Sequence, residues 1–220
     1  MAKFATDMEQ LEQLLTKMGE AVTVSRGETI YQPGDPSTSV CVVEAGRVKL
    51  AYLDESGKKL TLSILDTGEI FGERCLVGEK YRRYLATAIA ETTYRSIKKE
   101  RVVKLINSNP LHLREMLLHF ARRGRQLEET LEDIVFKNIQ TRLSRQLLKL
   151  SNEYGVQTKE GTLIGFQLTH KELADMIGSA RENTTIALNR FQDEGILDKS
   201  RYRIVIKSEE GLREKCKLPG

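Results

Sequence analysis

The sequence predicts an α+β protein, and three observations predict this class. Residues 21–97 hold short β-rich runs that turns interrupt about every eight to twelve residues, as in a compact antiparallel sandwich or barrel. Residues 110–135 have apolar side chains at alternating steps of four and three, as in a helix with a narrow apolar seam. Residues 169–195 follow the pattern of a helix, a short glycine turn and a second helix.

The composition is that of a globular protein. A chain of 220 residues, 40% of them hydrophobic, is long enough for one large or two small domains. The net charge of +4 permits nucleic-acid binding without proving it. The N-terminus shows no long apolar run, so we expect no signal peptide and no membrane span. Cys41, Cys75 and Cys216 are far apart in the sequence, which favours a reduced, cytoplasmic protein without disulfides.

The β-rich domain is expected to cover residues 1–109. A short helix over Met8–Met18 opens it, and a helix from Val102 to Ile106 closes it. A glycine-rich turn over Gly68–Glu73 is followed by Arg82 and Arg83. Such a turn frees backbone N–H groups for an anion, and an arginine offers a fork for phosphate or carboxylate. The alternative is an ordinary solvated turn with a paired surface arginine.

A dimerisation helix is expected over residues 110–137. Pro110 suits the first helical turn, and Asn109 can cap it. A narrow stripe on an otherwise charged helix suits the same helix of a second copy, while burial against its own domain is the alternative. The glycine in this seam either lets two backbones approach or leaves room for a ligand. The seam comprises Leu113, Leu117, Phe120, Gly124, Leu127, Leu131 and Ile134.

The DNA-reading domain is expected over residues 138–220. A helix covers residues 137–154, and residues 163–168 suit a short strand. Thr169 and Glu172 match a capping box at the start of the first helix of the pair. In the second helix we expect Ile186, Leu188 and Phe191 to point inward and Gly195 to end it. Residues 196–207 suit a two-stranded wing.

The second helix of the pair begins with side chains that suit base edges. Arginine can bind guanine, glutamate can accept from cytosine, and asparagine can bind adenine. The expected base-reading residues are Arg181, Glu182, Asn183, Thr185 and Ile186, the last through a thymine methyl group. The expected phosphate contacts are Thr169, His170, Lys171, Ser179, Asn189, Lys199 and Arg201. A helix pair packed for structure alone, with a solvated wing turn, is the alternative.

Nearly the whole chain resembles the cyclic-AMP receptor protein / fumarate-nitrate reduction regulator (CRP/FNR) family. The motifs are the glycine pattern from Gly27 to Gly72, the run Phe71-Gly72-Glu73 with Arg82 or Arg83, and Leu168–Ala174 with Arg181-Glu182-Asn183-Thr184. The resemblance implies a β-roll of the cyclic-nucleotide-binding type, a long dimer helix and a winged helix-turn-helix. In cyclic-AMP receptors a third arginine reads the operator, and Ile186 stands at that position here.

Several effectors are compatible with the resemblance. In cyclic-AMP binding members, the glutamate that matches Glu73 holds the ribose, and an arginine followed by Ser or Thr holds the phosphate. In this chain Arg82 is followed by Arg83, and Arg83 is followed by Tyr84. They also have Thr-Ser on the central helix, where Leu127 and Glu128 stand. The nitrogen regulator type implies a 2-oxoglutarate-like dicarboxylate at Arg82 or Arg83, Arg123 and Glu128. Haem would need Cys75, His112 or His119, although we expect both histidines to face solvent.

The expected effector pocket therefore comprises Phe71, Gly72, Glu73, Arg82, Arg83, Arg123, Leu127 and Glu128. No metal or iron–sulfur motif and no catalytic triad, HExxH motif or P-loop is present in the sequence, so an enzyme is not expected. We expect a homodimeric regulator that binds double-stranded DNA at a near-palindromic operator, and the resemblance implies RNA polymerase as a further partner. The rival class is a ligand-binding regulatory module without a DNA function.

Overall fold

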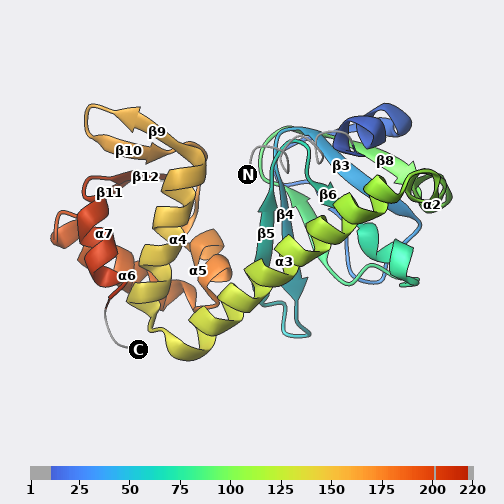
Figure 1. Cartoon of the computed structure of the whole chain (residues 1–220). Helices are drawn as coiled ribbons and strands as arrows, with labels where there is room; N and C mark the ends of the chain where they lie inside the picture. Colours follow the sequence, from blue (N-terminus) through green and yellow to red (C-terminus); the bar gives the residue numbers. More distant parts are fainter. Residues whose placement is uncertain (1–10, 201, 218–220) are drawn as a thin grey trace. The chain divides into compact units, whose positions relative to one another are not determined.

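The computed structural model describes residues 11–200 and 202–217, which form two compact units that divide within one long helix (Figure 1). The first unit covers residues up to Arg125 and the second begins at Gln126. The expected α+β class is confirmed, with β-strands dominating the first unit and helices the second.

Eight strands of the first unit form two antiparallel sheets. One sheet has the order β1-β8-β3-β6 and the other β2-β7-β4-β5. Residues 11–18 are helical, the part of the expected opening helix that lies within the described residues. The elements are β1 (Glu20–Val24), β2 (Thr29–Tyr31), β3 (Ser39–Ala45), β4 (Val48–Leu53), β5 (Lys59–Leu65), β6 (Ile70–Phe71), the 3-10 helix η1 (Glu73–Val77), β7 (Leu85–Ala88), β8 (Thr92–Lys98), α2 (Lys99–Ser108) and α3 (Pro110–Phe136).

Strand β3 organises the packing of this unit because it is buried on both faces. Alternate side chains of a strand point to opposite faces, so Val40 and Val42 pack under the helices while Cys41 and Val43 pack between the sheets. Met116 of α3 joins the first of these cores. Figure 1 shows α2 and α3 on the side of the sheet that contains β3, β6 and β8.

Helix α3 begins as the sequence predicted. Pro110 is its first residue, and the Asn109 side chain accepts a hydrogen bond from the Leu111 N–H at 3.0 Å. The structure also buries one face of α3 that the seam pattern did not predict. His112 and His119 lie on this face and are only 8% and 9% exposed. The expectation that both histidines face solvent was wrong: with Met116 they form an i, i+4, i+7 stripe that packs on the roll.

The second unit combines the end of α3 with four more helices and one small sheet. The strand order is β11-β12-β10-β9. The elements are α4 (Ile139–Tyr154), β9 (Gly155–Thr158), β10 (Gly161–Ile164), α5 (His170–Ile177), α6 (Arg181–Asp193), β11 (Leu197–Ser200), β12 (Arg203–Ile206) and α7 (Glu209–Lys215). The strand expected over residues 163–168 was misplaced, since β10 ends at Ile164. Helix α7 was not predicted.

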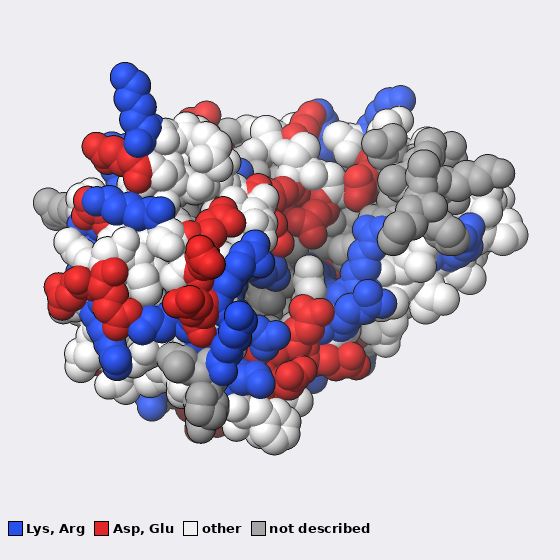
Figure 2. Space-filling model, turned by 60° about the vertical axis from the view of Figure 1, so that its left-hand side comes forward, with Lys and Arg blue, Asp and Glu red and all other residues white. Residues whose placement is uncertain are grey.

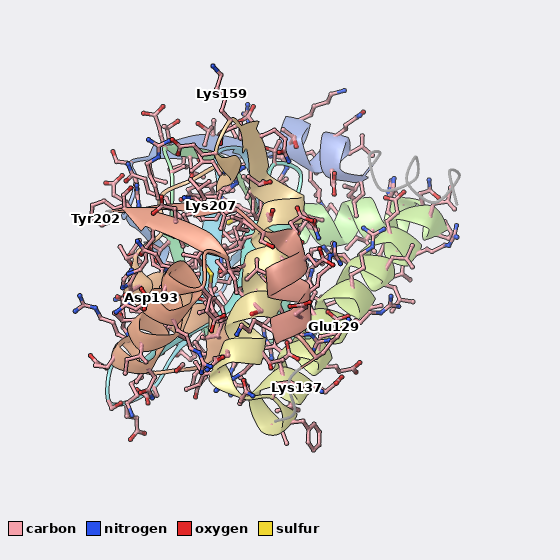
Figure 3. The ribbon with its side chains drawn as sticks, turned by 90° about the vertical axis from the view of Figure 1, so that its left-hand side faces the viewer. Glu129, Lys137, Lys159, Asp193, Tyr202 and Lys207 are labelled. Atoms are coloured by element: carbon pink, nitrogen blue, oxygen red, sulfur yellow. The ribbon has the colours of Figure 1, made fainter. Side chains whose placement is uncertain are left out.

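Figure 3 shows the two hairpins of this small sheet, with Lys159 at the tip of β9–β10 and Tyr202 at the tip of β11–β12. Tyr202 is the one non-glycine residue of the described chain with a positive φ, at 74°. Its carbonyl oxygen accepts a hydrogen bond from the Leu168 N–H at 3.1 Å. The tip of the wing is thereby tied to the residue that precedes the N-cap of α5.

Candidate functional sites

Helices α5 and α6 form the expected helix pair, and each boundary has a physical cause. Thr169 caps α5 by accepting from the Glu172 N–H at 3.0 Å, while Glu172 Oε2 accepts from the Thr169 N–H at 2.7 Å, so the capping box is confirmed. Gly178 ends α5 in the left-handed conformation at φ 60°. The predicted role of Gly195 is also confirmed, because it follows the C-cap of α6 with φ 73°.

A residue outside the expected set also stabilises this turn. The Arg142 Nη1 of α4 donates to the carbonyl oxygen of Ile177 at 2.7 Å, which places a cation at the C-terminus of α5. Burial lowers the pKa of Arg142 from its ordinary value. No local sequence pattern marks this contact, because 35 residues separate the two partners.

Helix α6 has one buried and one exposed face. Leu188 and Phe191 are completely buried, as expected. Ile186 is 65% exposed, so the expectation that it points inward was wrong, whereas its place among the base-reading candidates agrees with an outward side chain. Arg181, Glu182 and Asn183 are exposed on the first turn, while Thr185 is half-buried. Arg190, four residues after Ile186, shares this exposed face and pairs with Glu194 at 3.0 Å.

Several of the residues expected to contact phosphate form side-chain contacts within the protein. His170 Nδ1 lies 3.0 Å from Thr185 Oγ1, and Lys199 Nζ donates to Asn189 Oδ1 at 2.6 Å. Lys171 pairs with Asp175 at 2.7 Å and remains half-exposed. The hydroxyl of Ser179 is buried, and Arg201 lies outside the described residues. Burial, followed by the charges of Lys199 and Arg181, lowers the pKa of His170.

The face of the molecule seen in Figure 2 has mixed charge. In Figure 2, Lys and Arg side chains lie interspersed with Asp and Glu over the face in view, so this face presents no single positive field. The N-terminus of α6 adds a local positive end, because its N-cap Ala180 provides no side-chain hydrogen bond to the first turn.

The first unit contains a small cavity at the position of the expected effector pocket. Its volume is about 20 Å³, which is room for about one water molecule. Gly72, Glu73, Arg82, Arg83 and Arg123 line it, and α3 contributes Arg123 to this lining. Leu127 and Glu128, which were expected here, belong to the second unit.

Arg82 is the buried arginine of the expected pair, and Arg83 is exposed. Arg82 donates through Nη1 to the Gly72 carbonyl oxygen and through Nη2 to the Ser39 carbonyl oxygen, both at 2.8 Å. Its guanidinium lies 4.4 Å from the ring centroid of Tyr31. Gly72 has φ 73°, and a Cβ there would meet Arg82 Nη1 at 2.4 Å, so this position requires glycine.

Glu73 does not offer a free carboxylate to the cavity. Its Oε1 accepts from Arg123 Nη1 at 2.5 Å, and the Glu73 side chain is 5% exposed. Phe71 was expected in the pocket but is fully buried in the core between the sheets, where it stacks on Tyr31. Sequence reasoning missed Tyr31, Arg74 and Tyr84 as lining residues.

The residues considered for haem have other surroundings. Cys75 is buried in the core with Met116, and His112 Nδ1 lies 3.0 Å from the Leu105 carbonyl oxygen. Burial and the charge of Arg123 lower the pKa of His119 to about 4. None of the three lines the cavity. Among the described residues, no group of three or more His, Cys, Asp and Glu side chains is arranged to hold a metal ion.

The expected dimer seam is only partly free. Leu113, Leu117 and Leu131 are between 59% and 66% exposed, and Leu127 is 38% exposed. Phe120 instead packs partly on the core of its own unit. Ile134 is half-buried and close to Gly178, where a Cβ would meet it at 3.1 Å. A Cβ on Gly124 would meet nothing within 4 Å.

No helix in the described part of the chain is both long and apolar enough to cross a membrane.

Comparison with known proteins shows the family to which both units are related. Residues 21–109 match the model of the cyclic nucleotide-binding domain, and residues 141–215 match that of the Crp-like helix-turn-helix domain. Together these two matches cover the roll and the domain that contains the helix pair.

The relatives agree with both matches. The global nitrogen regulator of Synechococcus elongatus is 30% identical over 82% of this chain and 82% of its own. The cyclic AMP receptor protein of Thermus thermophilus is 30% identical over 78% of this chain and 76% of its own. A solved CRP/FNR-family regulator from Thermus thermophilus superposes with a TM-score of 0.78 at 26% identity, over 91% of this chain and all of that one. These relatives are transcriptional regulators rather than enzymes, and the chain belongs to the CRP/FNR family of DNA-binding transcriptional regulators.

Proposed function

We propose that the chain works as a homodimer that binds a near-palindromic double-stranded operator and responds to a small effector in its roll. The observation that favours this most is the exposed polar start of α6. Arg181, Glu182 and Asn183 are exposed there, while Leu188 and Phe191 fix the opposite side of the helix in a buried core. Helix-turn-helix proteins place such a helix start against base edges in the major groove.

In the proposed complex, base reading and phosphate binding fall to different side chains. Arg181 donates to guanine O6 and N7, Glu182 accepts from cytosine N4, Asn183 binds adenine, Thr185 assists, and Ile186 contacts a thymine methyl group. Thr169, His170, Lys171, Ser179, Asn189, Lys199 and Arg201 set the register on the phosphates. The short distances between His170 and Thr185 and between Lys199 and Asn189 support this division, because they hold His170 and Lys199 beside the reading helix.

Dimerisation through α3 is supported by its unusual surface. Exposed leucine side chains at seam positions of the seven-residue repeat suit a partner helix better than water, and they are Leu113, Leu117, Leu127 and Leu131. Two recognition helices in a two-fold dimer would meet major grooves about 34 Å apart, which explains why we expect a near-palindromic operator. RNA polymerase is the further partner that we propose from membership of the family.

The DNA proposal is tested by mobility shift on promoter fragments at increasing salt. We expect a shift that weakens steeply with salt, because phosphate contacts release counterions. A chain that shifts no fragment with any candidate effector would instead be a ligand-binding module without a DNA function.

The dimer proposal is tested by light scattering on Leu127→Asp. A charge placed in the seam should dissociate the dimer, whereas Arg122→Asp puts the same residue on an exposed position outside the seam and should leave it intact. If Leu127→Asp still has the mass of a dimer, the seam is not the interface.

A further inference from the structure

Another cavity of the chain is a groove within the second unit, and its volume is about 230 Å³. Every residue that lines it lies between Gln126 and Ile177, so the groove belongs to one compact unit. It runs between the end of α3 and helix α4, and α5 contributes its last two residues. Figure 1 shows the last turns of α3 and helix α4 as the arms of a V, with α5 between them.

The two helical walls of this groove carry opposite charge. The acidic residues come from α3 and the basic ones from α4, and they are Glu129, Glu132, Asp133, Arg142, Arg145 and Lys149. Asp133 pairs with Arg145. Glu129 and Glu132 are exposed and take part in no ion pair within the described chain. The α3 wall therefore retains carboxylates that are available to a cation.

The α4 wall has hydrogen-bond donors that lack a strong acceptor. Arg142 Nη1 binds the Ile177 carbonyl oxygen at 2.7 Å, but Arg142 Nε is buried without an acceptor in the described part of the chain. One helical turn later, Gln146 Nε2 donates to the Met176 sulfur at 3.7 Å, and a thioether is a weak acceptor. Buried charged donors without acceptors are rare because they lose their hydration. The two side chains therefore suit the oxygens of a ligand carboxylate.

The remaining lining is partly apolar, and the volume limits what can bind. Ile134, Met176 and Ile177 line the groove, and the last two are 7% and 4% exposed. A methionine side chain adapts its shape to different apolar groups. A volume of about 230 Å³ is below the roughly 300 Å³ at which pockets for drug-sized molecules begin. The groove therefore suits a compact ligand with one apolar group.

The groove lies beside the proposed dimer seam rather than on it. Its lining on α3 includes one seam residue, Ile134. Gln126, Glu129 and Asp133 follow one another at steps of three and four, so they share a neighbouring face of α3. A partner helix in the seam therefore does not occupy the face from which Glu129 and Asp133 project.

We infer that this groove binds a small zwitterion, an α-amino acid with an apolar side chain. Its carboxylate is held by Arg142 and Gln146, and its ammonium group is held by Glu129 and Glu132. The site is separate from the roll and from the helix start proposed to read DNA. A bound amino acid joins α3 to α4, the helix that also holds the end of α5 through Arg142. It therefore acts as a second effector, at the junction that leads to the helix pair.

The test is isothermal titration of the full chain with leucine, isoleucine, valine and methionine. We expect saturable binding of at least one of them. Its N-acetyl and its amide derivatives each lack one charge and should bind about tenfold more weakly or worse, the loss expected for a charge-assisted hydrogen bond. No saturable binding of any of the four amino acids, or equal binding of either derivative, overturns the inference.

Two double variants with the same net charge locate the site. Glu129→Gln combined with Glu132→Gln removes the carboxylates proposed for the ammonium group and should weaken binding about tenfold or more. Glu160→Gln combined with Glu210→Gln is the control, because both residues are exposed in the second unit and neither lines the groove. Gln146→Leu removes the amide donor and should also weaken binding. Equal affinity of the two double variants overturns the inference.

Discussion

The roll and the helix pair use the same kinds of side chain in opposite ways. In the roll, Arg82 and Glu73 are 8% and 4% exposed, and each is bonded to a neighbouring segment. In α6, Arg181 and Glu182 are exposed on the first turn. Arg82 and Glu73 are therefore part of the internal structure of the roll, whereas Arg181 and Glu182 point away from the core of their unit. Substitutions in the roll should therefore change folding stability, and substitutions on the outer face of α6 should change DNA affinity.

The largest effect is expected at the inner face of α6. Phe191 is completely buried, so Phe191→Ala should lower the free energy of unfolding by about 3–5 kcal/mol through lost burial and a cavity. Ile186→Ala on the exposed face should change it by less than about 0.5 kcal/mol. Urea denaturation of both variants measures the difference. Similar losses for the two would mean that Ile186 is packed rather than exposed.

The next effect is expected at the buried ion pair of the roll. Glu73→Gln leaves Arg123 without its carboxylate in a buried position, which should lower the free energy of unfolding by about 3 kcal/mol. Glu209→Gln removes the carboxylate of an ion pair whose side chains are 61% and 43% exposed, and should cost only about 0.5 kcal/mol. Urea titration of both variants tests this ranking. A Glu73→Gln variant as stable as Glu209→Gln would show that the roll tolerates an unpaired Arg123.

Features that depend on neighbouring residues could be predicted from the sequence, whereas contacts between distant residues could not. The capping box and the glycine that follows α6 were predictable because each depends on residues close together in the chain. The β-rich runs of residues 21–97 predicted strands, but they did not indicate that the side chains of β3 divide between two separate cores. The contacts of Arg82 with Ser39 and of Glu73 with Arg123 join residues 43 and 50 positions apart, and no local pattern indicates them.

The errors have a physical reason too. His112 and His119 lie on a strongly charged helix, which suggested solvent exposure, yet the roll covers one stripe of α3 and buries both. Ile186 was expected inside because it is apolar, although its position on α6 is opposite the buried Phe191. In both cases the position of the residue on its helix and the tertiary contacts of that helix, rather than the polarity of the side chain, decide its exposure.

A smaller effect, on DNA rather than on stability, is expected at the exposed start of α6. Arg181→Ala should weaken specific binding by about 1–3 kcal/mol and relax selectivity at one base pair. Lys171→Ala should weaken binding to all sequences alike and reduce the salt dependence. Fluorescence anisotropy on an operator and its single-base variants distinguishes the two. Unchanged selectivity in Arg181→Ala would remove this residue from base reading.

The smallest effect is a pH dependence of DNA binding through His170. This side chain is half-buried beside the proposed DNA surface, so it is intermediate between the buried polar residues of the roll and the exposed ones of α6. Burial and then Lys199 and Arg181 lower its pKa in the free protein, so the ring is neutral near pH 7. A DNA phosphate beside the ring would favour the protonated form and raise that pKa, so binding takes up a proton. Affinity should therefore increase as pH falls below His170's ordinary value, by about threefold for each half unit of pKa difference between bound and free protein. Anisotropy between pH 8 and about pH 5.5 measures this slope, and His170→Gln should flatten it. A slope that persists in His170→Gln would place the proton on another group.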